Sequence, residues 1–268
     1  MPTIPSRPAQ ESHQHREVAE SFGSDAERYD RTRPGYPPAL IDRLVTAEGL
    51  EILDVGSGTG LLARPLRAAG ARVLGVDPDP RMADYLRQFG IETEVATFEA
   101  WEPGGRQFDA VVAGQSWHWV DPVAGAAKAG TVLRPGGRLA VVWNAFEFPA
   151  GVGDAVEAVF RRVLPGAPPE QRIAPGPDGY LKLCEKAAGG MRESGAFAEP
   201  EVWRYDWSRP YTRDEWLDQV PTFGGFRFFP PATQERILAD LGSIIDSLGG
   251  SFTMTFGTVA AAAIRRPA

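Results

Sequence analysis

The stretch that most constrains the fold of this chain runs from Glu51 to Ala63 and reads EILDVGSGTGLLA. Its first residues form an apolar run of strand length that contains one acid. Glycines at positions 56, 58 and 60 then allow the backbone a sharp turn and leave no Cβ in the way of a ligand. The helix that we expect to begin there presents unpaired N–H groups to whatever lies in the turn. The stretch therefore predicts a strand, a ligand-binding turn and a helix.

Two kinds of nucleotide ligand suit this turn. Residues Gly58 to Ala63 match the loose dinucleotide pattern G-x-G-x-x-G/A, which predicts a pyrophosphate at the helix start. The second interpretation begins at Asp54, whose carboxylate ends the strand and would repel a pyrophosphate but pair with an ammonium group. S-adenosylmethionine carries an ammonium and a carboxylate beside a nucleoside, and it fits that acid better. A turn that binds no ligand is the third alternative.

Composition narrows the classes of function. The chain has 28 basic and 35 acidic residues, a net charge of −7, which argues against a nucleic-acid partner held by clustered Lys and Arg. It has no run of about 18 apolar residues, and residues 1–14 contain no hydrophobic run, so neither a membrane span nor a secretory signal is expected. The single cysteine, Cys184, excludes an internal disulfide, and no Cys/His cluster predicts a metal site. We therefore expect a cytoplasmic protein, and both a monomer and a homodimer are compatible with this composition.

Apolar strand-like runs alternate with helical patterns after the glycine turn. Further strands are expected at 72–77, 92–96, 108–113 and 138–143. Such alternation predicts an α/β fold with a doubly wound, mostly parallel sheet, and ligands bind such a sheet outside the carboxyl ends of its strands. The polar side chains expected at that edge are Asp54, Asp77, Thr97, Gln115, His118 and Asn144.

Asp77 ends the second strand, where a carboxylate can accept both hydroxyls of a ribose. Both nucleotide interpretations need this acid, so it does not distinguish them. Asp79 and Pro80 are expected as the N-cap and first residue of the next helix, as are Asp121 and Pro122 of a later one. Met82 is a candidate to cover an adenine, and plain core packing is its alternative.

An aromatic loop, Trp117-His118-Trp119, follows the strand at 108–113. His118 is the candidate catalytic base because its reference pKa is near neutral, and substrate hydrogen bonding and structural packing are the alternatives. The two tryptophans can cover a sulfonium or a substrate through cation–π contact. We therefore name Trp117, His118, Trp119 and Asn144 as candidate substrate-binding residues.

The string LDVGSGTG, from Leu53 to Gly60, resembles the first motif of class I S-adenosylmethionine-dependent methyltransferases. The turn LRPGGRL at 133–139 also resembles that family, and WHWVDP at 117–122 is similar to its trans-aconitate methyltransferase-like branch, methyltransferase type 11. The resemblance covers roughly residues 20–145 well and the rest by architecture alone. It implies a Rossmann-like seven-stranded sheet with an antiparallel last strand, and S-adenosylmethionine as cofactor.

The resemblance also implies the residues that hold the cofactor. Tyr29 and Arg33 belong to a segment that folds over the cofactor as a lid in this family, and by that likeness they face its carboxylate. Thr97 and Phe98 stand where the family flanks the adenine. The full set of cofactor candidates is Tyr29, Arg33, Asp54, Gly56, Ser57, Gly58, Gly60, Asp77, Pro78, Met82, Thr97, Phe98 and Gln115.

The expected segments are a disordered tail at 1–14, a helical lid at 15–47, the cofactor-binding core at 48–145, a helical insertion over the substrate side at 146–200 and C-terminal elements at 201–268 that complete the sheet. Phenylalanines within 223–229 can form an apolar substrate wall or pack in the core.

The predicted function is in-line transfer of a methyl group to an oxygen or nitrogen of a small molecule. A NAD(P)-dependent oxidoreductase and a non-catalytic S-adenosylmethionine-binding protein are the alternatives.

Overall fold

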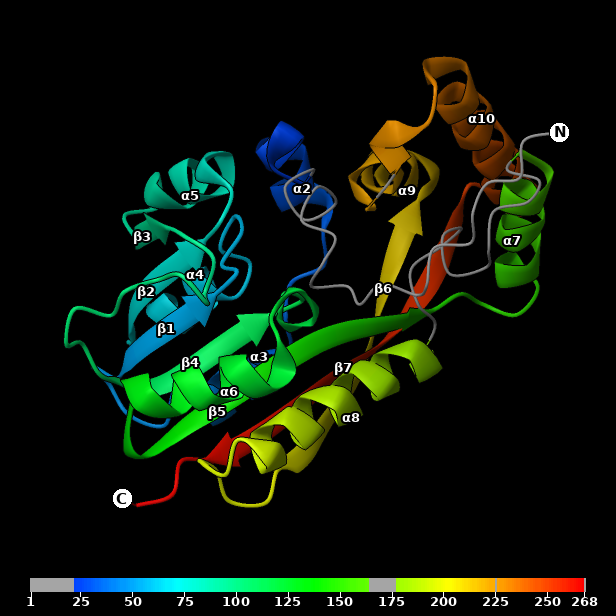
Figure 1. Ribbon diagram of the computed structural model, residues 1–268. Coiled ribbons are helices and arrows are strands. Elements are labelled where there is room, and N and C mark those ends of the chain that lie inside the picture. Colours follow the sequence, from blue (N-terminus) through cyan, green and yellow to red (C-terminus); the bar gives the residue numbers. More distant parts are fainter. Residues whose placement is uncertain (1–21, 164–176, 225, 268) are drawn as a thin grey trace, which may run out of the picture.

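The computed structural model describes residues 22–163, 177–224 and 226–267, so the predicted tail at 1–14 lies outside the described residues. A seven-stranded sheet with the order β3-β2-β1-β4-β5-β7-β6 lies at the centre (Figure 1). The strands are β1 (Glu51–Val55), β2 (Arg72–Asp77), β3 (Glu92–Val95), β4 (Phe108–Gly114), β5 (Leu133–Glu147), β6 (Glu201–Thr212) and β7 (Ser251–Ile264). Strands β1 to β5 are parallel, and β7 pairs antiparallel with β5 and β6. The predicted fold class is confirmed.

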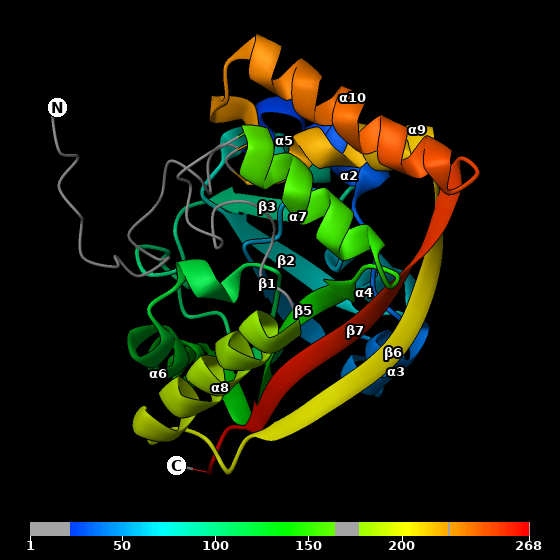
Figure 2. The ribbon, with the colours of Figure 1, turned by 90° about the vertical axis from the view of Figure 1, so that its right-hand side faces the viewer.

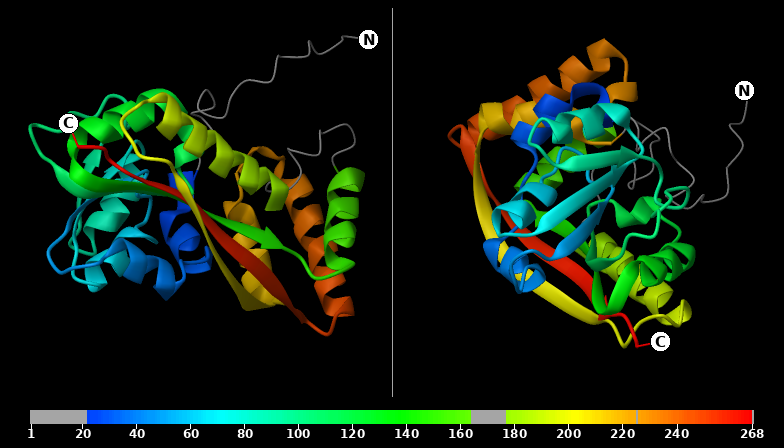
Figure 3. Two further views of the ribbon diagram at one scale, coloured as in Figure 1. Left: turned by 90° about the horizontal axis from the view of Figure 1, so that it is seen from below. Right: turned by 90° about the vertical axis from the view of Figure 1, so that its left-hand side faces the viewer.

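Helices cover both faces of the parallel strands, as Figures 2 and 3 show. Helices α3 (Pro38–Leu44) and α4 (Ala63–Ala68) pack on one face, and α6 (Pro122–Val132) and α8 (Pro177–Glu193) pack on the other. The remaining helices are η2 (Phe22–Asp25), α2 (Ala26–Thr32), α5 (Pro80–Arg87), η3 (Trp117–Trp119), α7 (Val152–Val163), α9 (Arg213–Gln219), η5 (Val220–Thr222), η6 (Phe226–Phe228) and α10 (Pro231–Ser247).

Two apolar cores form because successive side chains of a strand point to opposite faces of the sheet. In β1, Leu53 and Val55 join the core under α6 and α8, whereas Ile52 joins the core under α3 and α4. A parallel strand that is buried on both faces has to be apolar on both, which explains the nearly continuous apolar run in β1.

Strand β5 is longer than the predicted strand at 138–143. It runs to Glu147, which pairs with Thr255 of β7, and the β6–β7 hairpin continues to the pair Thr212–Ser251. Helices α7, α9 and α10 pack on this extension of the sheet, away from β1 to β3 (Figure 1), and form a third apolar core there. The prediction was too short at both ends, because Leu133 pairs with Phe108 of β4 and residues 144–147 pair with β7, which is distant in the sequence.

The segment 146–200, predicted as one helical insertion, divides between two places. Helix α7 packs against α10 on the sheet extension, whereas α8 packs against α6, β5 and β7. Helix α8 thereby buries Cys184 and Met191 in the main core, and burial raises the pKa of the Cys184 thiol to about 11. Helix α8 therefore belongs to the helices that cover one face of the α/β core. Of the two helices within 146–200, only α7 packs on the sheet extension.

Gly60 is the most tightly packed glycine of the turn after β1. Its φ is +90°, and a Cβ there would lie 2.3 Å from Cδ1 of Leu86, a fully buried side chain. We expect Gly60→Ala to lower the free energy of unfolding by about 2–4 kcal/mol, because it adds overpacking to backbone strain. Gly136 has a φ of +77° but no atom within 4 Å of its Cβ position, so Gly136→Ala should cost only about 1–2 kcal/mol. Urea unfolding measures both, and equal losses would contradict the packing role of Gly60.

Candidate functional site

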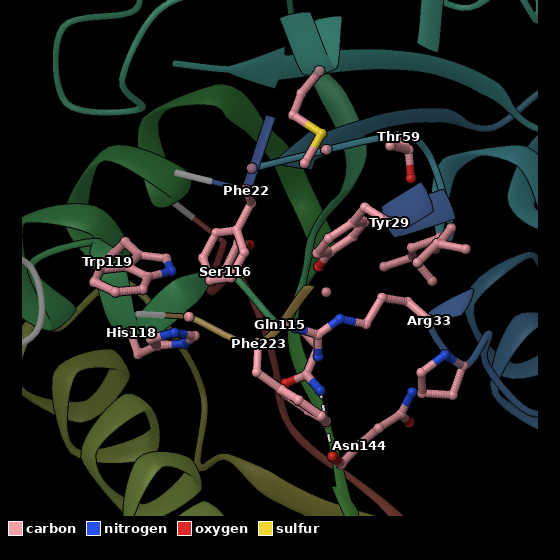
Figure 4. A pocket seen from close by; sticks show the side chains of 18 of the residues that line it. Phe22, Tyr29, Arg33, Thr59, Gln115, Ser116, His118, Trp119, Asn144 and Phe223 are labelled. Carbon is pink, nitrogen blue, oxygen red and sulfur yellow. Dashed lines mark hydrogen bonds between the residues drawn. The ribbon is translucent and has the colours of Figure 1, made fainter. Parts of the chain in front are cut away.

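A cavity of about 680 Å³ opens at the carboxyl edge of the parallel strands. Its volume lies in the range of about 300–1,000 Å³ that small-molecule sites occupy. All the predicted site residues line it except Gly60 and Trp117. Figure 4 shows several of them, among them Tyr29, Arg33, Gln115, His118 and Asn144, around one space.

Asp77 lies buried at the end of β2 and is held by backbone groups. Its Oδ2 accepts a hydrogen bond from the Gly58 N–H at 2.8 Å, and its Oδ1 accepts one from the Asp79 N–H at 2.9 Å. Burial raises the pKa of Asp77 to about 6, although these two bonds act in the opposite direction. Each carboxylate oxygen has a second lone pair. Asp77 can therefore hold the glycine turn against β2 and still accept the hydroxyls of a ribose.

Asp54 lies buried at the end of β1, and neither carboxylate oxygen has a hydrogen-bond partner among the described residues. Burial, and after it the charge of Asp77, raises the pKa of Asp54 well above its usual value. A buried carboxylate without a partner is costly. A ligand that brings an ammonium group to this acid removes the cost, and S-adenosylmethionine has such a group.

Two glycines of the turn have different surroundings: Gly56 is tightly packed and Gly58 is open. A Cβ on Gly56 would lie 2.4 Å from Cβ of Ser116, whose Oγ donates to the Val55 carbonyl at 2.5 Å. Gly56 therefore lets the ends of β1 and β4 meet. Gly58 has no atom within 4 Å of its Cβ position, so its backbone faces open space in the cavity. Gly60 instead packs against Leu86, outside the cavity, which corrects its predicted place beside the cofactor.

The predicted lid residues join two distant parts of the chain. The Arg33 guanidinium lies over the rings of Tyr29 and Phe223, 5.0 Å and 4.6 Å from their centres, and its Nη2 donates to the Thr222 carbonyl at 2.5 Å. The Arg33 Nε is buried and has no partner in the described part of the chain. Helix α2 thus closes against η5 over the strand ends, and Tyr29 and Arg33 both face the cavity (Figure 4).

Gln115 has a strained backbone. Its φ of 58° is the only positive φ among the described residues that are not glycine. Its Nε2 donates to the Asn144 carbonyl at 3.3 Å. Strained residues often occur at functional sites, where surrounding contacts hold them. The sequence carried no signal for this strain.

Asn144 lines the cavity, but its amide is already engaged. Its Nδ2 donates to the Gly35 carbonyl at 2.9 Å, and its Oδ1 accepts from Oγ1 of Thr258 at 2.7 Å. These bonds tie the segment after α2 to β5 and β7. The geometry favours a supporting role for Asn144 beside its predicted contact with substrate.

His118 is held as a neutral ring. Nε1 of Trp143 donates to its Nδ1 at 3.3 Å, so the ring proton lies on Nε2. Burial lowers the pKa of His118 to about 4. At neutral pH the side chain is therefore a hydrogen-bond donor at the cavity wall. Its ring centre lies 4.7 Å from that of Trp119, which also lines the cavity (Figure 4).

Trp117 does not reach the cavity, contrary to the prediction. It is 2% exposed and packs in the main core, where its ring centre lies 5.9 Å from that of Phe98. The short helix η3 sends Trp117 inward while His118 and Trp119 face the cavity. A repeated aromatic pattern cannot show which of its members faces inward.

The other half of the wall comes from the sheet extension, and most of its residues were not predicted. It includes Phe146, Val156, Trp216, Gln219 and Leu241, which lie far apart in the sequence. Only the phenylalanines within 223–229 gave a signal, and three of them, Phe223, Phe226 and Phe229, line the cavity.

The described ranges contain neither a group of metal ligands nor a helix that could span a membrane. Among residues 22–163, 177–224 and 226–267, no three His, Cys, Asp or Glu side chains are grouped as a metal ion would require. Within the same ranges, no helix has both the length and the apolar character needed to cross a bilayer.

Comparison with known sequences identifies the central part of the chain. Residues 53–141 match the family model of a methyltransferase domain. An uncharacterised methyltransferase of Mycobacterium tuberculosis (strain H37Rv) is 44% identical over 131 residues, which are 48% of this chain and 54% of that protein. The chain therefore spans about half the length of this curated relative. An uncharacterised methyltransferase of Schizosaccharomyces pombe is 24% identical over 238 residues, 86% of this chain and 89% of that protein.

Solved structures share the fold. A protein of Anaeromyxobacter dehalogenans, provisionally assigned as a type II methyltransferase, has a TM-score of 0.63 at 23% identity and covers 88% of this chain and 99% of its own. A phosphoethanolamine N-methyltransferase of Haemonchus contortus, solved with S-adenosylmethionine, has a TM-score of 0.55 at 16% identity over 98% of this chain and 62% of that one. The predicted domain class and fold are confirmed. S-adenosylmethionine is the cofactor of such domains, and the unpaired Asp54 and the cradle at Gly58 fit it.

Asp54→Asn tests two effects of this acid separately: the folding stability lost by burying its charge, and its contribution to ligand binding. At pH 7 we expect the variant without ligand to be more stable than the parent, because the fold disfavours the charged form of Asp54. The difference should vanish as the pH falls, since Asp54 of the parent then takes up a proton. The affinity for S-adenosylhomocysteine should fall by about 1–3 kcal/mol. Scanning calorimetry at a series of pH values from 7 downward measures the difference in stability, and ligand titration measures the affinity. A less stable variant at pH 7 would mean that Asp54 is paired.

Proposed function

We propose that this chain, whose residues 53–141 form a methyltransferase domain within the class I S-adenosylmethionine-dependent fold, transfers a methyl group to an oxygen or nitrogen of a small molecule. The main support is one continuous cavity, which joins the glycine turn and its two buried acids to a second compartment. Methyl transfer needs donor and acceptor in one enclosed space, with the nucleophile about 3 Å from the methyl carbon.

S-adenosylmethionine supplies a methyl group on a positively charged sulfur, and the electron pair of the broken C–S bond stays on that sulfur while the acceptor's lone pair forms the new bond. The residues of this chain bind and orient the reactants. Asp54 pairs with the ammonium group and Asp77 accepts the ribose hydroxyls. Tyr29 and Arg33 cover the carboxylate end and exclude water.

His118 orients the acceptor in this proposal and does not act as its base. Nδ1 is occupied by the Trp143 N–H, and Nε2 carries the proton, so neither nitrogen can take a proton from the acceptor at neutral pH. An acceptor hydroxyl therefore loses its proton to solvent, and the Nε2–H donates to the reacting atom. The predicted catalytic role of His118 becomes a positioning role.

Calorimetry with S-adenosylhomocysteine and with NADH tests the cofactor. We expect saturable S-adenosylhomocysteine binding and none with NADH. Asp77→Ala should weaken that binding by about 1–3 kcal/mol, because a buried hydrogen-bonding pair is lost. Asp84→Ala, an exposed acid on α5, is the matched control and should bind as the parent does. NADH binding without S-adenosylhomocysteine binding would overturn the proposal in favour of an oxidoreductase.

Transfer itself is measured with methyl-labelled S-adenosylmethionine and a broad panel of phenols, alcohols, carboxylic acids and amines. Labelled product supports the proposal. Tight cofactor binding with no labelled product from any member would favour the non-catalytic alternative.

The protonation and tautomer of the His118 ring can be observed directly by NMR, because His118 is the only one of the chain's three histidines beyond residue 21. In histidine labelled with ¹⁵N, we expect His118 to stay neutral and protonated at Nε2 from neutral pH down to about 4. Trp143→Phe removes the donor and should give a mixture of tautomers. Trp119→Phe changes a ring contact but no hydrogen bond and should keep the Nε2–H form. A His118 that titrates near its reference pKa would restore the role of base.

A further inference from the structure

Part of the cavity is walled by side chains of the third apolar core. We define the aromatic chamber as the part of the cavity lined from the sheet extension and helices α7, α9, η6 and α10. Its main wall residues are Phe146, Val156, Trp216, Phe226, Leu241 and Phe256. All except Phe146 are at most 4% exposed, although they line an open space. An apolar wall of this kind holds water poorly and favours an apolar occupant.

No described residue of the chamber carries a charge. The charged side chains of the whole cavity, within the described ranges, are Arg33, Asp54 and Asp77. The two acids belong to the cofactor half, and Arg33 already donates to the Thr222 carbonyl between two rings. Bringing a carboxylate into such a space costs several kcal/mol unless a cation pairs with it. The chamber is therefore unsuited to an acceptor with several acidic groups.

The polar groups of the chamber are neutral. They are the Gln219 amide and the Trp216 indole N–H, both on α9. Gln219 is 3% exposed, and its Oε1 has no hydrogen-bond partner in the described part of the chain. A hydroxyl or N–H group on the occupant would satisfy this oxygen.

We propose that the methyl acceptor is an uncharged molecule with an extended apolar body, such as an alkyl- or aryl-substituted phenol or amine, and that this body fills the aromatic chamber. The proposal rests on the proposed function, because it assigns the acceptor of the same site. The acceptor's reacting atom lies at the chamber mouth, beside the Nε2–H of His118, and its body extends toward α7 and α10.

A neutral fluorescent probe, N-phenyl-1-naphthylamine, tests the chamber in the full-length protein saturated with S-adenosylhomocysteine. We expect saturable binding of one probe per chain, with increased emission. 4-Alkylphenols should displace the probe, each added methylene tightening the competitor by about fourfold until the chamber is full. Citrate and 4-hydroxybenzoate should not displace it.

Two phenylalanines of one short helix provide a matched pair. Phe226 is 3% exposed and lines the chamber, whereas Phe228 is 58% exposed and does not. Phe226→Ala should weaken probe binding by about tenfold or more, because it removes a large apolar contact. Phe228→Ala should leave it unchanged. Val156→Trp fills the chamber from α7 without leaving a hole, and it should also weaken the probe by about tenfold or more while S-adenosylhomocysteine still binds.

The outcomes separate the two proposals. Failure of S-adenosylhomocysteine binding in the parent protein would overturn the proposed function. If S-adenosylhomocysteine binds but the probe does not, the chamber is not the acceptor site. The same conclusion holds if the Phe226→Ala and Phe228→Ala variants bind the probe equally. Methylation of citrate or 4-hydroxybenzoate, with none of the alkylphenols, would likewise overturn the assignment of an uncharged acceptor. If Phe226→Ala does not fold, the Val156→Trp variant decides between these results.

Discussion

Two carboxylates buried at neighbouring strand ends, Asp54 and Asp77, dominate the energetics of this site. Burial disfavours the charged form of each acid, so both oppose folding at neutral pH. Asp77 offsets part of that cost by accepting two backbone N–H groups, which also hold the glycine turn against β2. Asp54 has no such bonds within the described chain, and in the proposed function the ammonium group of the cofactor pairs with it. On that proposal the site gives up folding stability in exchange for ligand binding.

The sheet extension separates the two tasks of the protein. The parallel strands β1 to β4 end at the cofactor half of the cavity, where the polar groups lie. Strands β5 to β7 continue beyond them and carry α7, α9 and α10, whose apolar side chains form the other half. Arg33 and Asn144 connect the two parts, since one reaches Thr222 and the other joins Gly35 to Thr258. A shared fold does not determine a substrate, and we propose that in this chain the substrate side is built on the extension.

Features that depend on neighbours in the sequence were predicted well. The strand–glycine–helix unit, the caps at Asp79 and Asp121 and the alternation of strands and helices along the chain all follow from local patterns, and the caps are present as side-chain bonds to Arg81, Val123 and Ala124 N–H groups. Features that depend on distant partners were missed. The length of β5 is set by β7, and the inward turn of Trp117 is set by packing against Phe98. The Gln115 side chain, on a residue with a strained backbone, bonds to Asn144, which no local pattern links to it.

The sequence alone determined that acids and glycines gather where a nucleotide ligand can bind, because any parallel sheet brings residues at fixed spacing in adjacent βα units to one edge. Only the tertiary structure decided which nitrogen of His118 carries the proton, since that depends on the Trp143 indole from the neighbouring strand. It also decided that apolar residues from six separate elements enclose a chamber in which no described residue carries a charge. A helical stripe or an aromatic cluster in a sequence shows that a surface is buried, but only packing shows whether that surface faces another side chain or a cavity.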